Sequence, residues 1–285
     1  MSSKLKRKLK NLPMDQNNSI FLASPVVRSF GKINWRGFWT LYLAEVKRFY
    51  KMRTQALIAP IITTLLFFFI FTLALDGTKE ILGDLSFSVF LAPGLIMMSI
   101  LQSSFANTSS SILVSKVQGN IVDTLMSPLS SIELTAAYVA GGVTRGLLVG
   151  FLSTMTISIF VSIHIQHFSI ILFYALGASM MLSLLGLIGG IWAKKFDHIA
   201  AMTNFIVVPL SFLSGTFYSI DLLPKAWENL VWFNPFFYVI DGFRYGFINR
   251  MDGDLWLGIL IIVIINSILF TVACKIFAIG YKLKS

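Results

Sequence analysis

Residues 56–75 read ALIAPIITTLLFFFIFTLAL, a run without a single charged side chain. The hydrocarbon core of a bilayer is about 30 Å thick, and a helix needs about 20 apolar residues to cross it. This run therefore predicts a membrane-spanning helix. Five further apolar stretches of comparable length follow it, at about residues 87–114, 136–163, 170–193, 199–220 and 255–279.

These six stretches define the fold class. A membrane barrel would instead show segments of about ten residues with alternating polarity, and the sequence has no such pattern. A helix satisfies its backbone hydrogen bonds internally, as the interior of a bilayer requires. The sequence therefore predicts an all-α polytopic membrane protein, with six transmembrane helices in residues 56–285.

The composition of the whole chain agrees with this class. Of the 285 residues, 56% are hydrophobic and only 13% are charged, whereas an average soluble protein has about 25% charged residues. A soluble enzyme is therefore disfavoured. Disorder is excluded, because disordered chains are poor in apolar residues. The single cysteine, Cys274, excludes a fold held together by disulfides.

The basic residues lie mainly on one side of the predicted spans. More than half of the 23 Lys and Arg residues precede the first span, and acidic residues collect in the loops on the opposite side. Loops rich in Lys and Arg stay in the cytoplasm, so we expect both termini to be cytoplasmic. This asymmetry explains the net charge of +10, because the basic residues are concentrated at one face of the membrane, where they can contact lipids. We therefore expect no nucleic acid as a partner.

The segment before the first span has two parts. Residues 1–32 are basic and polar, and we expect them to form a cytoplasmic tail. Residues 33–55 interleave aromatic and basic side chains at helical spacing, which predicts an amphipathic helix in the plane of the lipid headgroups. The alternative is an aromatic belt on the same face. The apolar positions are Trp35, Trp39, Tyr42, Val46, Phe49 and Tyr50.

Two loops also carry short helical patterns. In residues 115–133, Ile121, Leu125 and Met126 are expected to share one face of a two-turn helix that offers apolar contacts to a partner. The alternative is a turn lying on the membrane. Residues 221–254 are rich in aromatic residues and interrupted by prolines, which predicts one or two short helices dipping into the outer leaflet. An interfacial aromatic belt is the alternative there.

Several kinds of chemistry have no support in the sequence. No Walker A pattern GxxxxGK[ST] occurs, so we do not expect this chain to bind ATP itself. The spans contain no Asp or Glu, which disfavours a proton- or sodium-coupled transporter. His164 and His167 could share a metal ion, but two imidazoles alone make a weak site. We therefore predict no catalytic residue, no metal site and no cofactor in this chain.

Polar side chains inside the spans are candidates for a path through the membrane, because they are costly in lipid. The second half of the second predicted span is polar, and a guanidinium lies within the third. Small residues surround this guanidinium and favour close helix packing, which is the alternative role. The four candidates are Gln102, Asn107, Arg145 and Asn204.

Seven short motifs follow one another along the chain. They are Glu45-Val46-Lys47-Arg48, Pro93-Gly94-Leu95, QGNIVDTL at 118–125 with Ser127-Pro128, Gly141-Gly142-x-x-Arg145-Gly146, Gly215-x-Phe217-Tyr218, Asn234-Pro235 and Asp241-Gly242-Phe243-Arg244. Through them the chain resembles, over about residues 35–285, the permease subunits of type-two ATP-binding-cassette (ABC) exporters. That family includes polysaccharide, lipooligosaccharide and drug exporters.

The resemblance implies how the chain would work. A separate ABC ATPase would use ATP and Mg, two copies of this chain would form a homodimer, and the assembly would lie in the bacterial inner membrane. Residues 33–55 would be an interface helix, about 116–128 the coupling helix that docks on the ATPase, and about 221–254 the re-entrant outer segment. The coupling residues would be Gln118, Gly119, Asp123, Leu125, Pro128, Glu45 and Arg48, and the outer motif Asn234, Pro235 and Arg244.

The function predicted on this basis is ATP-driven export of a polysaccharide, a lipid-linked molecule or a drug-like molecule. Two other classes stay open. A channel or membrane scaffold without ATP coupling is compatible with the polar second span. An integral-membrane enzyme acting on lipid-linked substrates would need a clustered acid–base or metal site, and the sequence does not indicate one.

Overall fold

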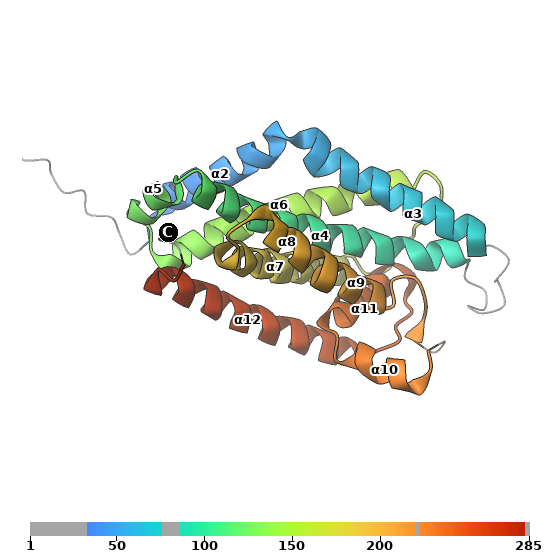
Figure 1. Cartoon of the computed structure of the whole chain (residues 1–285). Coiled ribbons are helices and arrows are strands. Elements are labelled where there is room, and N and C mark those ends of the chain that lie inside the picture. Colours follow the sequence, from blue (N-terminus) through green and yellow to red (C-terminus); the bar gives the residue numbers. More distant parts are fainter. Residues whose placement is uncertain (1–32, 76–85, 221–222, 283–285) are drawn as a thin grey trace, which may run out of the picture. The chain divides into compact units, whose positions relative to one another are not determined.

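A computed structural model of the chain describes residues 33–75, 86–220 and 223–282 (Figure 1). The predicted tail of residues 1–32 lies outside these ranges. In the described part the ordered elements are helices, and no strand occurs among them. This agrees with the predicted all-α class.

Six helical segments in the described ranges are long and apolar enough to cross a membrane, which confirms the six-span prediction. They are Thr54–Ala74, Phe87–Val117, Ser131–Ile157, Phe168–Trp192, Phe196–Leu213 and Leu255–Ile279.

Two of the six segments contain a turn of π-helix. The first is η2 (Thr54–Ile58) followed by α3 (Ala59–Leu75), and the fifth is α8 (Phe196–Met202), η3 (Thr203–Val207) and α9 (Val208–Leu213). The other four are α4 (Phe87–Val117), α6 (Ser131–Ile157), α7 (Phe168–Trp192) and α12 (Leu255–Ile279). Between and before them lie α2 (Trp35–Lys51), α5 (Ile121–Met126), α10 (Lys225–Trp232) and α11 (Pro235–Ile248).

The helix boundaries follow local signals that the hydropathy pattern does not contain. Helix α6 begins earlier than predicted, because Ser130 and Glu133 form a capping box at its start. The fifth span ends at Leu213 and not near residue 220, since Gly215 there takes a left-handed conformation with φ of 71°. The sixth span has the predicted bounds, with Gly280 in a left-handed cap at its end.

Helix α4 forms the centre of the bundle. In its most apolar window 83% of the residues are buried, against 22% for the first and sixth spans and 11% for the fifth. Glycines let its neighbours approach closely: a Cβ on Gly146 of α6 would overlap the Ser104 hydroxyl, and one on Gly186 of α7 would lie 2.5 Å from the Phe105 carbonyl oxygen. This is the small-residue packing found between membrane helices.

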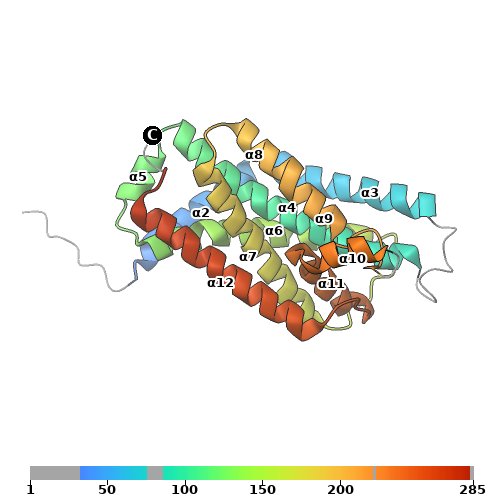
Figure 2. The same ribbon diagram turned by 60° about the horizontal axis from the view of Figure 1, so that its bottom comes forward.

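The shorter helices gather at the two ends of the spans. Helix α5 and the start of α2 lie near the end of α12, whereas α10 and α11 lie at the opposite end (Figures 1 and 2). Ile121 and Leu125 belong to the same apolar cluster as Phe277 of α12. The two ends of the bundle thus carry different short helices and are available for two different contacts.

Candidate functional site

The predicted coupling segment forms a short helix at the end of the bundle, preceded by a sharp turn. Gln118 caps the end of α4 and is exposed. Gly119 has φ of 77°, which a side chain would strain. Pro128 is exposed just after α5. The segment of residues 116–128 is therefore partly the last turn of α4 and partly the separate helix α5.

The apolar side chains of α5 divide between two faces, which corrects the predicted single face. Ile121 is 4% exposed and packs inward together with Leu125, four residues later. Val122 and Met126, which are also four residues apart, are 47% and 80% exposed. Asp123 is exposed beside them. The outward surface of α5 is thus Val122, Asp123 and Met126, and Leu125 anchors the helix.

Asn34 joins the coupling segment to the start of α2. Its side-chain amide donates to the Pro128 carbonyl at 3.0 Å. Its backbone N–H donates to Glu133 at 2.5 Å, and its Oδ1 accepts from Gly37 N at 3.0 Å. Glu133 also accepts from Ser130 N, at 2.7 Å. Sequence reasoning missed Asn34, although the spacing of Ser130 and Glu133 was a readable capping signal.

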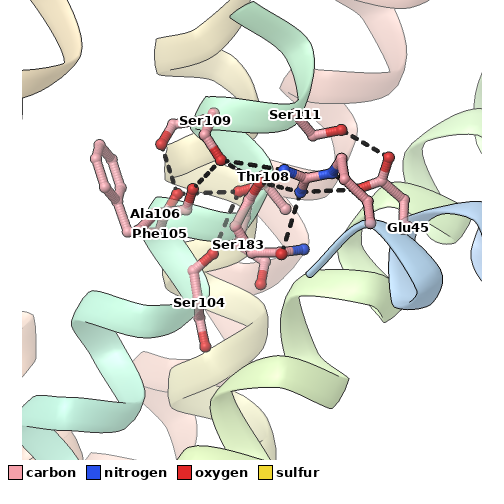
Figure 3. A network of polar contacts seen from close by, with 11 residues as sticks. Glu45, Ser104, Phe105, Ala106, Thr108, Ser109, Ser111 and Ser183 are labelled. Carbon is pink, nitrogen blue, oxygen red and sulfur yellow. Dashed lines mark hydrogen bonds and ion pairs between the residues drawn. The ribbon is translucent and has the colours of Figure 1, made fainter. Parts of the chain in front are cut away.

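Glu45 is buried in a polar network (Figure 3), and the partly exposed Arg48 belongs to the same network. They form an ion pair at 3.1 Å. Ser111 of α4 donates to Glu45 at 2.6 Å, and Arg48 donates to the backbone and side-chain oxygens of Asn107 at 2.8 and 3.1 Å. The structure therefore brings together two predicted coupling residues and one predicted path residue.

This network fixes α2 against α4 and α6. Glu45 is 5% exposed, and a Cβ added to Gly141 of α6 would lie 2.7 Å from its Cβ. Removing one member of a buried ion pair costs about 3–5 kcal/mol, because it leaves a buried charge without a partner. A displacement of α2 would consequently be transmitted to the central helix.

A groove of about 280 Å³ lies between the first span, α4, α6 and η3. Gln102 and Arg145, both predicted path residues, line it together. Arg145 Nε donates to the Ala56 carbonyl in η2 at 3.3 Å. Asn107 and Asn204 do not line it: Asn107 is fully buried beside Arg48, and Asn204 is exposed on η3. Two of the four predicted path residues therefore line one groove.

Both π-helical turns border this groove. Gln55 of η2 and Thr203 of η3 are among its lining residues. Turns of π-helix inside α-helices are rare and occur frequently at functional sites. We refer to this feature as the Arg145 groove. Its lining is Gln55, Ala59, Pro60, Thr63, Thr64, Phe67, Leu95, Met98, Ser99, Gln102, Ser103, Ala106, Arg145 and Thr203.

At the opposite end, several of the sequence motifs meet around Arg244. This side chain is 1% exposed and donates to the Gly215 carbonyl at 2.5 Å. Its guanidinium lies 4.0 Å from the centre of the Phe90 ring. A Cβ on Gly94 would come within 2.7 Å of the Thr216 carbonyl oxygen. Motifs that are far apart in the sequence thus surround one buried cation.

Asp241 provides the negative charge for this cation. Its carboxylate lies 4.0 Å from Arg244 and accepts the backbone N–H groups of Asp252 and Gly253 at 3.1 and 2.8 Å. Burial raises the pKa of Asp241 above its ordinary value, against the opposing effects of Arg244 and the two amides. The cluster ties α11 to the loop before α12.

The other two residues of the predicted outer motif begin α11. Asn234 accepts from Phe236 N at 3.0 Å, and its amide donates to the Leu210 carbonyl of α9 at 2.8 Å. Pro235 occupies the first helical position, where its missing N–H costs nothing. Most of the aromatic side chains of α11 are buried. They pack inside the bundle, whereas an interfacial belt would leave them exposed.

Potential metal ligands do not cluster in the described ranges. No group of three or more His, Cys, Asp or Glu side chains could hold an ion there. His164 is exposed, and the ring of His167 stacks on Tyr245 with centroids 5.5 Å apart.

The six spans, the turn-and-helix segment at one end and the buried Arg244 cluster at the other describe a polytopic membrane protein. A sequence profile of the ABC-2 type transporter family matches residues 36–248, and the chain belongs to this family.

The chain is also similar to named transport permeases. The chain is 36% identical over 233 residues to the inner membrane transport permease YadH of Escherichia coli K12, covering 81% of this chain and 91% of YadH. The YadH proteins of Escherichia coli O157:H7 and Shigella flexneri match with the same identity and coverage. Membership of the family implies an ABC ATPase partner in general terms.

Proposed function

We propose that this chain is the permease subunit of an ATP-driven exporter in the bacterial inner membrane, with both termini in the cytoplasm. A separate ABC ATPase uses ATP and Mg, and two copies of the chain form the membrane part. Family membership and the name of the YadH relatives support a permease. The excess of Lys and Arg before the first span supports the orientation.

The observation that carries this proposal is the connected path from the surface of α5 to the central helix. The outward face of Val122, Asp123 and Met126 offers apolar and acidic contacts to a partner. Asn34 binds Pro128, two residues after α5, to the start of α2. The Glu45–Arg48 pair then binds α2 to α4.

The mechanism follows from these contacts. Closure of the ATPase dimer displaces α5, and the hydrogen bonds of Asn34 carry the displacement to α2. The network around Arg48 passes it to α4, which packs against α3, α6, α7 and α11. Interdigitated cores rearrange between discrete packings and do not deform continuously. The spans would then open toward the outer side.

Co-purification tests the docking surface. The tagged chain is expressed with its ATPase and purified in mild detergent, as parent, Asp123→Lys and Met126→Glu. We expect the ATPase to co-purify with the parent and to be lost with each variant, because both side chains are exposed and neither change disturbs the core. Leu125→Glu is unsuitable, since Leu125 packs inward.

The matched control is Ile132→Glu, on an exposed side chain at the start of α6. It should retain the ATPase. An ATPase that co-purifies equally with all variants would place docking elsewhere. ATPase activity in the purified chain alone, or no associated ATPase under any condition, would contradict the proposal and favour a channel or scaffold.

A further inference from the structure

Arg145 carries a charge that the described chain does not neutralise. It is the fifteenth of the 27 residues of α6, near the middle of a span. Its Nε donates a hydrogen bond to the Ala56 carbonyl. The ion pairs within the described ranges join other residues. An arginine near the bilayer centre is costly, and such residues generally face a cavity and pair with a partner.

The counter-charge cannot come from the spans of this chain. The third and fifth spans begin earlier than predicted and therefore include Glu133 and Asp197, the acidic residues of the spans in the described ranges, and both lie at a helix start. Glu133 precedes Arg145 by 12 residues, or about 18 Å along the axis. A second copy of the chain carries its acidic residues at the same depths. Glu45 is already paired with Arg48.

The groove around Arg145 offers further donors. The side chains of Gln55, Gln102 and Ser103 line the groove together with Arg145. Two amide groups and a hydroxyl, together with the terminal nitrogens of the guanidinium, form a set of donors suited to an oxyanion with several oxygens.

The rest of the lining is apolar. Phe67, Leu95 and Met98 line the groove beside these donors, together with Ala59 and Pro60 of the exposed helix α3. A small hydrophilic anion would leave this part unused. A molecule with an anionic head and a hydrocarbon tail would use both parts.

We propose that the Arg145 groove binds an anionic amphiphile, with a phosphate head on Arg145 and the glutamine amides and an apolar tail along α3. Binding itself needs no ATPase. That this ligand is the transported substrate, or a close chemical relative of it, rests on the proposed function.

Equilibrium binding tests this. The full-length chain is placed in phosphatidylcholine nanodiscs, and binding of radiolabelled dodecyl phosphate is measured against empty nanodiscs. We expect Arg145→Gln to weaken binding about tenfold or more, because a charge-assisted contact is lost. Arg145→Lys should stay near the parent. Arg36→Gln removes the same charge from the exposed face of α2 and should change nothing.

Four results would overturn the proposal. Two concern the variants: Arg145→Gln binds as tightly as the parent, or Arg36→Gln weakens binding as much as Arg145→Gln does. The other two concern the parent chain: it elutes as one folded species but shows no saturable binding, or inorganic phosphate competes as strongly as dodecyl phosphate. Competition from phosphatidylglycerol in the nanodisc identifies a bilayer lipid as the occupant, and its absence a free amphiphile; both support the site. Co-purification of the ATPase with Arg145→Gln separates this result from the proposed function.

Discussion

Arg48 on α2 donates from one nitrogen to both the backbone and the side-chain oxygen of Asn107 on α4, at 2.8 and 3.1 Å. The same nitrogen lies 3.1 Å from Glu45. One guanidinium thus joins α2, which Asn34 links to Pro128 of the predicted docking segment, to the central helix of the bundle.

Glu45→Ala should destabilise the chain, because it leaves Arg48 without its carboxylate and Ser111 without its acceptor. The loss of unfolding free energy should be about 3 kcal/mol, the lower end of the range for buried pairs, since Arg48 is partly exposed. Thermal unfolding in detergent measures it. Lys47→Ala, on the exposed side of α2, is the control. Equal unfolding temperatures for the two variants would show that the pair contributes nothing.

Gly146→Ala should loosen α6 from α4, because the new Cβ would overlap the Ser104 hydroxyl. Overpacking of this kind typically costs about 1–3 kcal/mol. The double variant Gly146→Ala with Ser104→Ala should recover most of that, since the Ser104 hydroxyl has no hydrogen-bond partner to lose. Thermal unfolding of the parent, the single variant and the double variant measures these differences in stability. A double variant no more stable than the single one would contradict the packing argument.

Asn34→Ala should free the residues around α5. It removes the cap on Gly37 and the hydrogen bond to the Pro128 carbonyl. Loss of a helix cap costs about 1 kcal/mol. Hydrogen exchange should become faster at the Gly37 amide and around residues 127–130. Asn120→Ala, whose side chain bonds only the exposed Gln118, should leave exchange at Gly37 unchanged. Unaltered exchange in Asn34→Ala would mean that the link is not formed.

Arg244→Gln should be more damaging than Asp241→Asn. The first change removes the bond to the Gly215 carbonyl and leaves Asp241 buried without its cation. In the second, the asparagine Oδ1 can still accept from the amides of Asp252 and Gly253. The yield of monodisperse protein and its unfolding temperature should fall in the order parent, Asp241→Asn, Arg244→Gln. The reverse order would show that the carboxylate, and not the guanidinium, organises this end.

The predictions made from sequence succeeded where the signal is local. The six spans, including the bounds of α12, follow from runs of apolar residues. The fifth span was predicted too long, because residues 214–220 carry no charge and include Phe217 and Ile220, but the chain leaves the helix at Gly215. The shared face of Ile121, Leu125 and Met126 was wrong, since a six-residue helix leaves its inward direction to its neighbours.

The roles assigned to the candidate residues stay predictions, and the way the structure groups these residues was not foreseen. Asn107 and Gln102 lie on the same helix, and only the approach of α2 assigns the first to the Arg48 network and the second to the Arg145 groove. Asn34 was missed because a single asparagine before a helix says nothing about a loop nearly a hundred residues later.

The sequence by itself determined that this chain lies in a membrane, how many times it can cross and which family it resembles, because hydropathy and short motifs are properties of contiguous residues. Only the tertiary structure decided which charges are neutralised. Glu45 meets Arg48 and Asp241 lies beside Arg244, whereas Arg145 meets no carboxylate in the described chain. Charge pairing depends on distances of a few ångströms between helices, and those distances arise only when the bundle packs.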